Sequence, residues 1–500
     1  MKKRIVVNIY ASLLLEIVSV ICGFVLPRLI MVNYGSEYNG IVSSVAQGLS
    51  IITLLRGGVG GVTRAALYKP LVEQDTLRIS EILRATEMFM RRIAYIFAVF
   101  LLLFACVYPV FVREEFAYSY TASLILILGI NTFVQYYFGI SNQMLLQADQ
   151  RQYVFSCLQI FAILLNTIVS VILINAGLEF RLVKLISSLV FCIVPVGLYF
   201  YTRRKYQIIR DARCDYSVLE QRWDAFAHQV AAFLHTNTDI VLLTCFSDLF
   251  QISIYTVYNM VTNGVRKLVN VCTSGIDAAI GKLLASNENG TLKRSMEIYE
   301  WIMHVMGMIL FSCTALLIVP FVMIYTDGVK DANYFQPLLG FLMSLSQFIF
   351  CIRLPYQNVV EAAGQFKQTK NGAIIETALN IIVSVPLTIL WGGVGAVIGT
   401  IVANSFRTIQ YAYFASEKIL KRSSGAVTKR MAVSGGIGLV MIGIWRIIDI
   451  ESFLWNVDSY FTWMLHAGCV FLVVTILTIV ANGAAYPELL CFIGKKTYRK

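Results

Sequence analysis

The sequence predicts an all-α polytopic membrane protein with about 14 transmembrane helices. Of its 500 residues, 58% are hydrophobic and only 14% are charged, and the mean hydropathy is +0.70. Soluble domains are about 45–50% apolar and about 25% charged, so this composition excludes an ordinary soluble protein. Apolar runs of about 20 residues recur from end to end, and each is long enough to cross a hydrocarbon core as a helix.

The predicted helices follow the peaks of hydropathy along the chain. They cover residues 6–32, 39–66, 93–112, 119–146, 154–175, 182–202, 223–245, 250–284, 301–325, 334–361, 373–391, 393–415, 431–449 and 459–482. The first resembles a signal peptide because it begins with Met-Lys-Lys-Arg. However, Glu16 interrupts its apolar run, and no small-residue cleavage site precedes Met31. We therefore expect an uncleaved first span.

Loop charge predicts which side each loop faces. Basic residues gather on the amino-terminal side, as in residues 203–213 and 418–430, whereas opposite loops are short and mostly acidic, as at Glu114 and Glu115. By the positive-inside rule, both termini face the cytoplasm. The formal charge of +12 is then mostly a consequence of membrane topology, and no nucleic-acid partner is expected. We predict a multi-pass membrane protein.

An internal repeat predicts how the helices are grouped. Residues 65–71 (AALYKPL) are similar to 278–284 (AAIGKLL), and 145–148 (LLQA) to 359–362 (VVEA), at nearly the same separation. Transporter folds are commonly built from such repeated halves, with the binding site between them. Two pseudo-symmetric six-helix lobes follow. We predict an N-lobe at 1–202, a cytoplasmic linker at 203–222, a C-lobe at 223–415, helices 13 and 14 at 431–482, and a basic cytoplasmic tail at 483–500.

The sequence contains no recognisable catalytic or metal-binding motif. Residues 275–282 resemble a phosphate loop, but the glycines are one residue too far apart, and Leu283 stands where Ser or Thr would hold magnesium. The 11 cysteines contain no Cys-x-x-Cys pair, so neither a disulfide framework nor a metal site is predicted. We expect a protein that is not an enzyme and has no cofactor. Gly395 and Gly399 suit close helix packing, with a flexible point as the alternative.

Ionisable residues within the predicted spans are the candidate functional residues, because each costs at least about 2.5–3.5 kcal/mol at a helix centre. The basic ones are Arg28, Arg56, Arg266, Arg353 and Arg407, and the acidic ones are Glu16, Asp239, Asp277 and Glu376. Arg56 and Arg266 lie deep in the second helix of each lobe. A guanidinium grips phosphate oxygens with two parallel hydrogen bonds. The five arginines are therefore the predicted phosphate- or pyrophosphate-binding residues, with snorkelling to an interface or helix packing as the alternative.

A second set of polar residues predicts ion coupling. His228, His235 and Asp239 share one face of the predicted seventh helix. A titratable group in a spanning helix is costly, so Asp239 and His235, together with Glu16, are candidates for proton or sodium coupling. The alternative is that these side chains are hydrogen-bonded between helices.

These features together resemble the multidrug, oligosaccharidyl-lipid and polysaccharide exporter superfamily, and within it the Wzx-type flippases of bacterial polysaccharide synthesis. The resemblance rests on Pro27-Arg28, on residues 34–40 (YGSEYNG), on Arg56 with its neighbouring glycines, on residues 145–148, and on the number of spans. It runs along the whole chain.

The resemblance implies a V-shaped pair of lobes around a cationic cavity. Such a protein moves a lipid-pyrophosphate-linked oligosaccharide from the inner to the outer leaflet by alternating access, for cell-surface polysaccharides such as O-antigen. Its partners are an undecaprenyl-pyrophosphate-type substrate, membrane lipids and the polysaccharide polymerase machinery. Arg56 and Arg266 occupy places where related flippases carry cavity arginines, and helices 13 and 14 are similar to an extra pair that borders a groove for the lipid tail.

Two other functions stay open. An ion-coupled multidrug exporter of the same superfamily would have an acidic cation site in its first lobe, where this chain has Glu16. A scaffold or lipid scramblase would need neither buried arginines nor repeated lobes. The sign of the cavity charge separates the first two, because most drug exporters carry cationic cargo.

Overall fold

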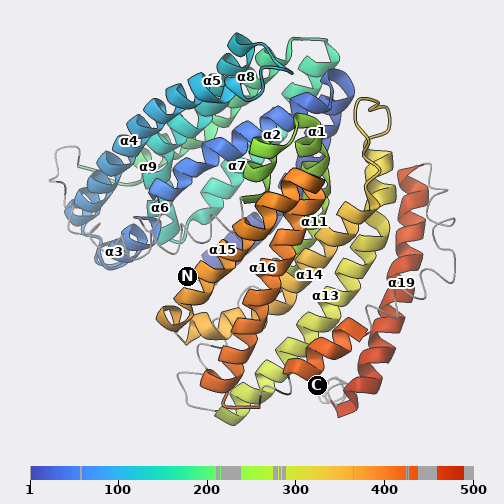
Figure 1. The fold of residues 1–500 in the computed structure, drawn as a ribbon. Coiled ribbons are helices and arrows are strands. Elements are labelled where there is room, and N and C mark those ends of the chain that lie inside the picture. The colour runs from blue at the N-terminus through green and yellow to red at the C-terminus, as the bar shows by residue number, and fades with distance from the viewer. Residues whose placement is uncertain are drawn as a thin grey trace. The chain divides into compact units, whose positions relative to one another are not determined.

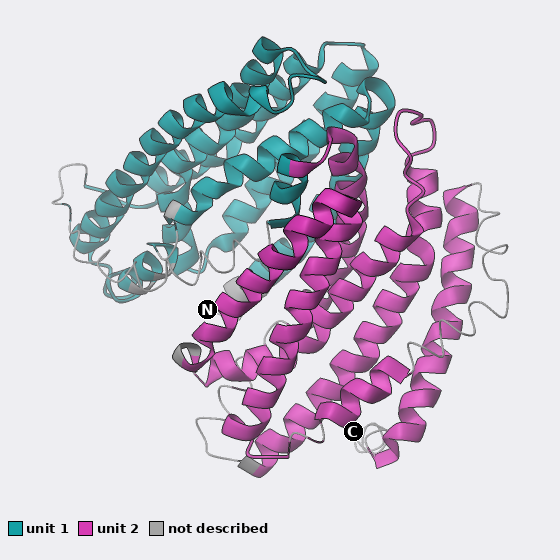
Figure 2. Ribbon diagram, viewed as in Figure 1, with its two compact units in different colours: residues 1–245 teal, residues 246–500 magenta. Residues whose placement is uncertain are grey.

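A computed structural model describes residues 2–56, 59–209, 238–273, 289–363, 365–423, 427–436 and 459–488, with single positions at 214, 280, 283 and 425. Throughout these described ranges the regular elements are helices and no strand occurs, which confirms the predicted all-α fold (Figure 1). The chain divides into two compact units, Met1–Cys245 and Phe246–Lys500 (Figure 2). Each unit is considered by itself below.

Within the described ranges, nine helices are long and apolar enough to cross a membrane, so the chain is a multi-pass membrane protein. The count of 14 stays a prediction. Two of the predicted spans, 223–245 and 431–449, fall largely outside the described residues. The predicted lobe and linker boundaries also stay predictions.

Unit 1 is a bundle of helices whose ends mostly lie close to the predicted ones. Its elements are α1 (Lys2–Tyr34), α2 (Ser36–Ser50), η1 (Ile51–Arg56), α3 (Val59–Glu73), α4 (Thr76–Val107), α5 (Tyr118–Val134), η3 (Gln135–Gly139), α6 (Ile140–Ala148), α7 (Gln152–Asn175), α8 (Phe180–Phe191) and α9 (Ile193–Lys205). The predicted helix 39–66 is not continuous, because α2 passes into the 3₁₀ turn η1 directly before a glycine-rich stretch.

Two further departures from the predicted boundaries have local causes. The predicted span 182–202 consists of α8 and α9, separated at Cys192, because Pro195 lacks an N–H and its ring clashes with the carbonyl four residues earlier. Helix α4 begins well before predicted residue 93, since Asp75 caps it by accepting a hydrogen bond from the Arg78 backbone N–H at 2.9 Å. Hydropathy finds only the apolar half of such a helix.

Unit 2 contains the helices that carry most of the candidate arginines. Its elements are α11 (Leu249–Thr273), α13 (Asn289–Tyr325), α14 (Pro337–Ala362), α15 (Phe366–Trp391), α16 (Gly393–Phe414), the π-helical turn η5 (Ala415–Ile419) and α19 (Tyr460–Ala485). Helices α11 and α16 are absent from the nine apolar helices of the described chain. The buried polar residues Asn404 and Arg407 of α16 are tolerable in a membrane because other helices of the unit cover them.

Equivalent ion pairs in the two units support an internal duplication. In unit 1, Arg203 Nη2 lies 3.1 Å from both carboxylate oxygens of Glu87 on α4. In unit 2, Arg422 Nη2 lies 2.5 Å from Glu300 Oε1 on α13. Glu87 and Glu300 are separated by the same number of residues as residues 65 and 278 of the sequence repeat. Each pair thus joins a corresponding glutamate to an arginine near the end of its repeat, Arg203 within the last turn of α9 and Arg422 shortly after η5.

Candidate functional site

Four helices of unit 2 bring three of the five predicted arginines together. We call this group the basic cluster, and it consists of Arg266 on α11, Phe350 and Arg353 on α14, Glu376 on α15 and Arg407 on α16. The arginines were predicted from their cost in a membrane, and their convergence within one lobe is the new observation.

Close packing of α15 against α16 positions the acidic and basic partners. A Cβ atom at Gly395 would lie 1.9 Å from the backbone oxygen of Leu387, and one at Gly399 would lie 1.9 Å from Ser384 Oγ. Only glycine fits at these two points of contact. The close-packing interpretation of both glycines is therefore supported. The same close contact of α15 with α16 holds Glu376 against Arg407.

Glu376 bridges two of the guanidinium groups. Its Oε1 lies 2.8 Å from Arg353 Nη1, and its Oε2 lies 3.4 Å from Arg407 Nε. The three side chains are 6–9% exposed, so the ion pairs are shielded from water. A buried guanidinium without a partner is strongly unfavourable, and Glu376 stabilises both arginines where they lie.

Neutral groups complete the hydrogen bonding of Arg407 and Arg353. Arg407 donates from Nη1 to the Thr369 carbonyl at 2.9 Å and from Nη2 to the Tyr411 hydroxyl at 2.7 Å. Arg353 donates from Nη1 to Asn404 Oδ1 at 3.4 Å. Its Nε is buried and has no hydrogen-bond partner among the described residues. Arg407 is thus engaged through its whole guanidinium, whereas the Nε donor of Arg353 is left unused.

Arg266 is held differently. Its Cζ lies 3.7 Å from the centroid of the Phe350 ring, and Arg353 Cζ lies 4.6 Å from the same centroid. Within the described residues, no carboxylate lies at ion-pair distance from Arg266, whose side chain is half-buried. Three guanidiniums and one carboxylate leave the basic cluster with two net positive charges. Arg266 is therefore the cation of the cluster that can bind an anionic ligand.

The predicted arginines of unit 1 lie in different surroundings. Arg56 is exposed at the end of η1, and Arg28 is half-buried on α1. Tyr136 and Phe350 are separated by the same number of residues as 145 and 359 of the repeat, and Arg56 is near enough to Tyr136 to interact with it electrostatically. Each unit thus has an arginine near an aromatic residue; the aromatic residues correspond by the repeat, and the arginines correspond only to within about one helical turn.

The ion pairs of the basic cluster have no such counterpart. The same separation that relates Tyr136 to Phe350 relates Gly139 to Arg353 and Ala162 to Glu376. Unit 1 therefore has small apolar residues where unit 2 has its central ion pair. The charge of the cluster is a feature of the second repeat.

The candidates for ion coupling are placed only in part. Asp239 and Glu16 are half-buried in unit 1, while His228 and His235, and also Asp277, lie outside the described residues. No group of three or more potential metal ligands occurs among the described residues. Ion coupling stays a prediction.

Sequence reasoning noted Glu376 as a membrane charge but did not include it in the site, and it missed Phe350, Asn404 and Tyr411. Of these residues, only Phe350 had a signal in the sequence, because the internal repeat relates it to Tyr136. The other contacts depend on how far each helix is rotated and how closely it packs, which the sequence pattern does not specify.

Comparison with known proteins identifies the fold. No protein-family model matches the sequence, and no curated protein sequence matches it. Among solved structures, the lipid II flippase MurJ in an inward closed conformation matches with a TM-score of 0.69 and 12% identity, covering 97% of this chain and 100% of MurJ.

Two transporters of the MATE family match as well. An inward-facing multidrug resistance MATE transporter of the MOP superfamily gives a TM-score of 0.58 at 13% identity, covering 83% of this chain and 99% of its own. The eukaryotic MATE transporter AtDTX14 gives 0.54 at 13% identity, covering 86% and 98%. At such identities the likeness shows the fold alone. The chain has the fold shared by the flippase MurJ and the MATE transporters.

Proposed function

We propose that this chain is a flippase that moves a lipid-pyrophosphate-linked oligosaccharide from the inner to the outer leaflet by alternating access, for cell-surface polysaccharide synthesis. The observation that carries the proposal is Arg266, a half-buried guanidinium in a cluster with two net positive charges. The MurJ-like fold adds weight, because MurJ is described as a flippase of lipid II.

The chemistry of the cluster suits a diphosphate. A diphosphate diester carries two negative charges, and the basic cluster carries two net positive charges. Stacking on Phe350 fixes the plane of the Arg266 guanidinium while its N–H groups stay able to donate in that plane. A preoriented guanidinium loses less entropy when it binds a phosphate. Lysine in its place would offer a point charge without the two parallel hydrogen bonds.

Arg353 and Arg407 have a supporting role in this proposal. Glu376 engages both, so their charge acts on a ligand at Arg266 without direct contact. Arg56 and Arg28 are the proposed phosphate-binding residues of unit 1. The sugar portion would be bound by neutral polar side chains, and its identity does not follow from charge. The substrate lipid and the polysaccharide polymerase machinery are the proposed partners, in the bacterial inner membrane with both termini cytoplasmic.

Binding of a polyprenyl-diphosphate-linked sugar to the purified protein tests the role of Arg266. We expect Arg266→Ala to weaken binding at least about tenfold, because a hydrogen-bonded charge pair contributes about 1.5–3 kcal/mol. Arg266→Lys should restore only part of the affinity. Lys267→Ala is the matched control, since it removes the same charge from the next residue of α11, which is exposed. Equal binding by wild type and Arg266→Ala would refute this assignment.

A second candidate is an ion-coupled multidrug exporter, favoured by the match to MATE transporters. It would use Glu16, Asp239 and His235 for proton or sodium coupling. The two functions differ in the charge of the cargo, because a cluster with net positive charge repels cationic drugs. Transport of a cationic dye driven by an imposed proton or sodium gradient, and lost in Asp239→Asn, would favour the exporter.

A further inference from the structure

Helix α13 is longer than a membrane span requires. Its 37 residues extend about 55 Å, whereas a hydrocarbon core of about 30 Å needs about 20 residues. Residues 306–325 contain no Asp, Glu, Lys, Arg or His, while Lys293, Arg294, Glu297, Glu300 and His304 all precede them. The second half of α13 therefore crosses the core, and Trp301 lies at the level of the lipid headgroups, where tryptophan is enriched.

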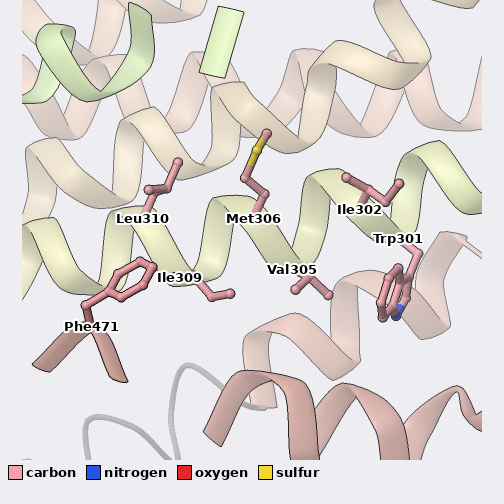
Figure 3. A pocket seen from close by; sticks show the side chains of 7 residues that line it. All are labelled: Trp301, Ile302, Val305, Met306, Ile309, Leu310 and Phe471. Carbon is pink, nitrogen blue, oxygen red and sulfur yellow. The ribbon is translucent and has the colours of Figure 1, made fainter. Parts of the chain in front are cut away.

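An apolar groove runs along α13 from this level into the membrane. It is lined by Trp301, Ile302, Val305, Met306, Ile309 and Leu310 of α13 and by Phe471 of α19, and its volume is about 280 Å³ (Figure 3). The residues of α13 recur at helical spacing and so form one face. Ile302 and Phe471 are 42% and 47% exposed, so the groove is open to the bilayer. Its shape and composition suit a hydrocarbon chain.

The headgroup end of the groove carries unused polar groups. Trp301 is 7% exposed, and its Nε1 has no hydrogen-bond partner among the described residues. By comparison, Trp463 at the N-terminal end of α19 donates a hydrogen bond from Nε1 to the Leu317 carbonyl at 3.2 Å. Unlike Trp463, Trp301 therefore has an N–H group that can donate a hydrogen bond to a lipid oxygen.

Positive charge gathers at the same end. Tyr486 packs against the Trp301 and Val305 pair. Lys429 Nζ lies 5.5 Å and Arg430 Cζ 5.8 Å from the centroid of the Tyr486 ring. Arg430 forms an ion pair with Glu300, whereas the exposed Lys429 has no carboxylate at ion-pair distance within the part of the chain described. An available cation therefore lies over the same Tyr486 ring that packs against Trp301.

We propose that this groove binds an anionic phospholipid of the cytoplasmic leaflet. One acyl chain lies along α13 from Val305 to Leu310, against Phe471, and the phosphate is bound by Lys429 and the Trp301 N–H. Charge complementarity selects this occupant, because the apolar channel ends at an available cation and a basic residue near the surface attracts anionic lipid. Such a lipid site is independent of which substrate the chain moves.

Fluorescence quenching by brominated lipids tests the site, because bromine quenches only tryptophans that it contacts. The purified full-length protein is placed in vesicles of phosphatidylcholine with increasing brominated phosphatidylglycerol or brominated phosphatidylcholine. The difference between wild type and Trp301→Phe isolates the Trp301 signal. We expect phosphatidylglycerol to half-saturate this signal at about fivefold lower mole fraction than phosphatidylcholine.

Two lysine variants test whether Lys429 causes the preference for phosphatidylglycerol. Lys429→Gln should bring the half-saturating mole fractions of the two lipids to about the same value. Lys418→Gln replaces an exposed lysine on η5 and should leave the preference for phosphatidylglycerol unchanged. Equal quenching of wild type by both lipids, or an equal effect of the two lysine variants, would overturn the proposal. It would also be overturned if a polyprenyl phosphate displaced the brominated phosphatidylglycerol far more effectively than unlabelled phosphatidylglycerol does, since the groove would then serve a prenyl chain.

Discussion

Glu376 is the residue on which the charge balance of the basic cluster depends. It is the single carboxylate among the described residues that bridges Arg353 and Arg407, and all three side chains are buried. Removing one partner from a buried ion pair leaves an uncompensated charge and typically costs about 3–5 kcal/mol. The cluster therefore contributes to the stability of unit 2 as well as to its charge.

We predict that Glu376→Gln lowers the thermal unfolding midpoint of the detergent-purified protein by several degrees at a fixed heating rate. Glu297→Gln is the control, because Glu297 pairs with Arg294 on the exposed surface of α13, and such pairs contribute about 0–1 kcal/mol. An unchanged midpoint in Glu376→Gln would contradict the bridging role.

The candidate site could be predicted from the sequence only in part. The high cost of charge in a membrane singled out Arg266, Arg353 and Arg407. Their convergence and their shared partner could not be predicted, because both depend on helix rotation and on the glycine contacts of α15 with α16. Hydropathy carries no information about either.

At the scale of elements, the spacing between α15 and α16 is set by glycine. A Cβ at Gly399 would lie 1.9 Å from Ser384 Oγ and 2.7 Å from the Ser384 backbone nitrogen, so the helices would have to move apart. Overpacking of this kind costs about 1–3 kcal/mol, or more where backbone must shift. The same movement would lengthen the contact of Glu376 with Arg407.

Gly399→Ala should therefore lower both the unfolding midpoint and the amount of folded protein recovered from membranes. Gly468→Ala in α19 is the matched control, since no atom lies within 4 Å of its added Cβ. Alanine there should be neutral or slightly stabilising, because it favours the helix over glycine. If both variants behaved alike, the close approach at Gly399 would not be needed for stability.

The repeated ion pairs differ in strength between the units. Glu300 is 1% exposed and forms ion pairs with both Arg422 and Arg430, whereas Glu87 is 7% exposed and forms an ion pair with Arg203. Arg430 belongs to the helical segment 427–436, which follows the second repeat. Glu300 therefore joins that segment to α13.

We expect Glu300→Gln to lower the unfolding midpoint more than Glu87→Gln, because it leaves two buried guanidiniums without their carboxylate. Limited proteolysis of the purified variants should also show faster cleavage near residues 427–436 in Glu300→Gln. Equal effects of the two substitutions on both measurements would show that Arg430 adds nothing to the second pair.

For the whole molecule, composition and hydropathy were sufficient to predict an all-α multi-pass protein. Apolar runs such as 154–175 and 459–482 have no other stable location, so most helices fall close to their predicted positions. Helices with polar faces were harder to delimit. The N-terminal half of α4, for example, carries too much charge to register as a span.

At the scale of the whole chain, the two candidate functions differ in whether the cargo is negatively or positively charged. Transbilayer movement of a polyprenyl-diphosphate-linked oligosaccharide, in proteoliposomes that contain the purified protein, is the most direct measurement. Delivery to the outer leaflet is followed with a sugar-modifying enzyme that cannot enter the vesicles. Wild type and Lys267→Ala should move the lipid at least about tenfold faster than Arg266→Ala or protein-free vesicles. Accumulation of a cationic dye in a proton or sodium gradient, with no movement of the lipid-linked sugar, would contradict the flippase assignment.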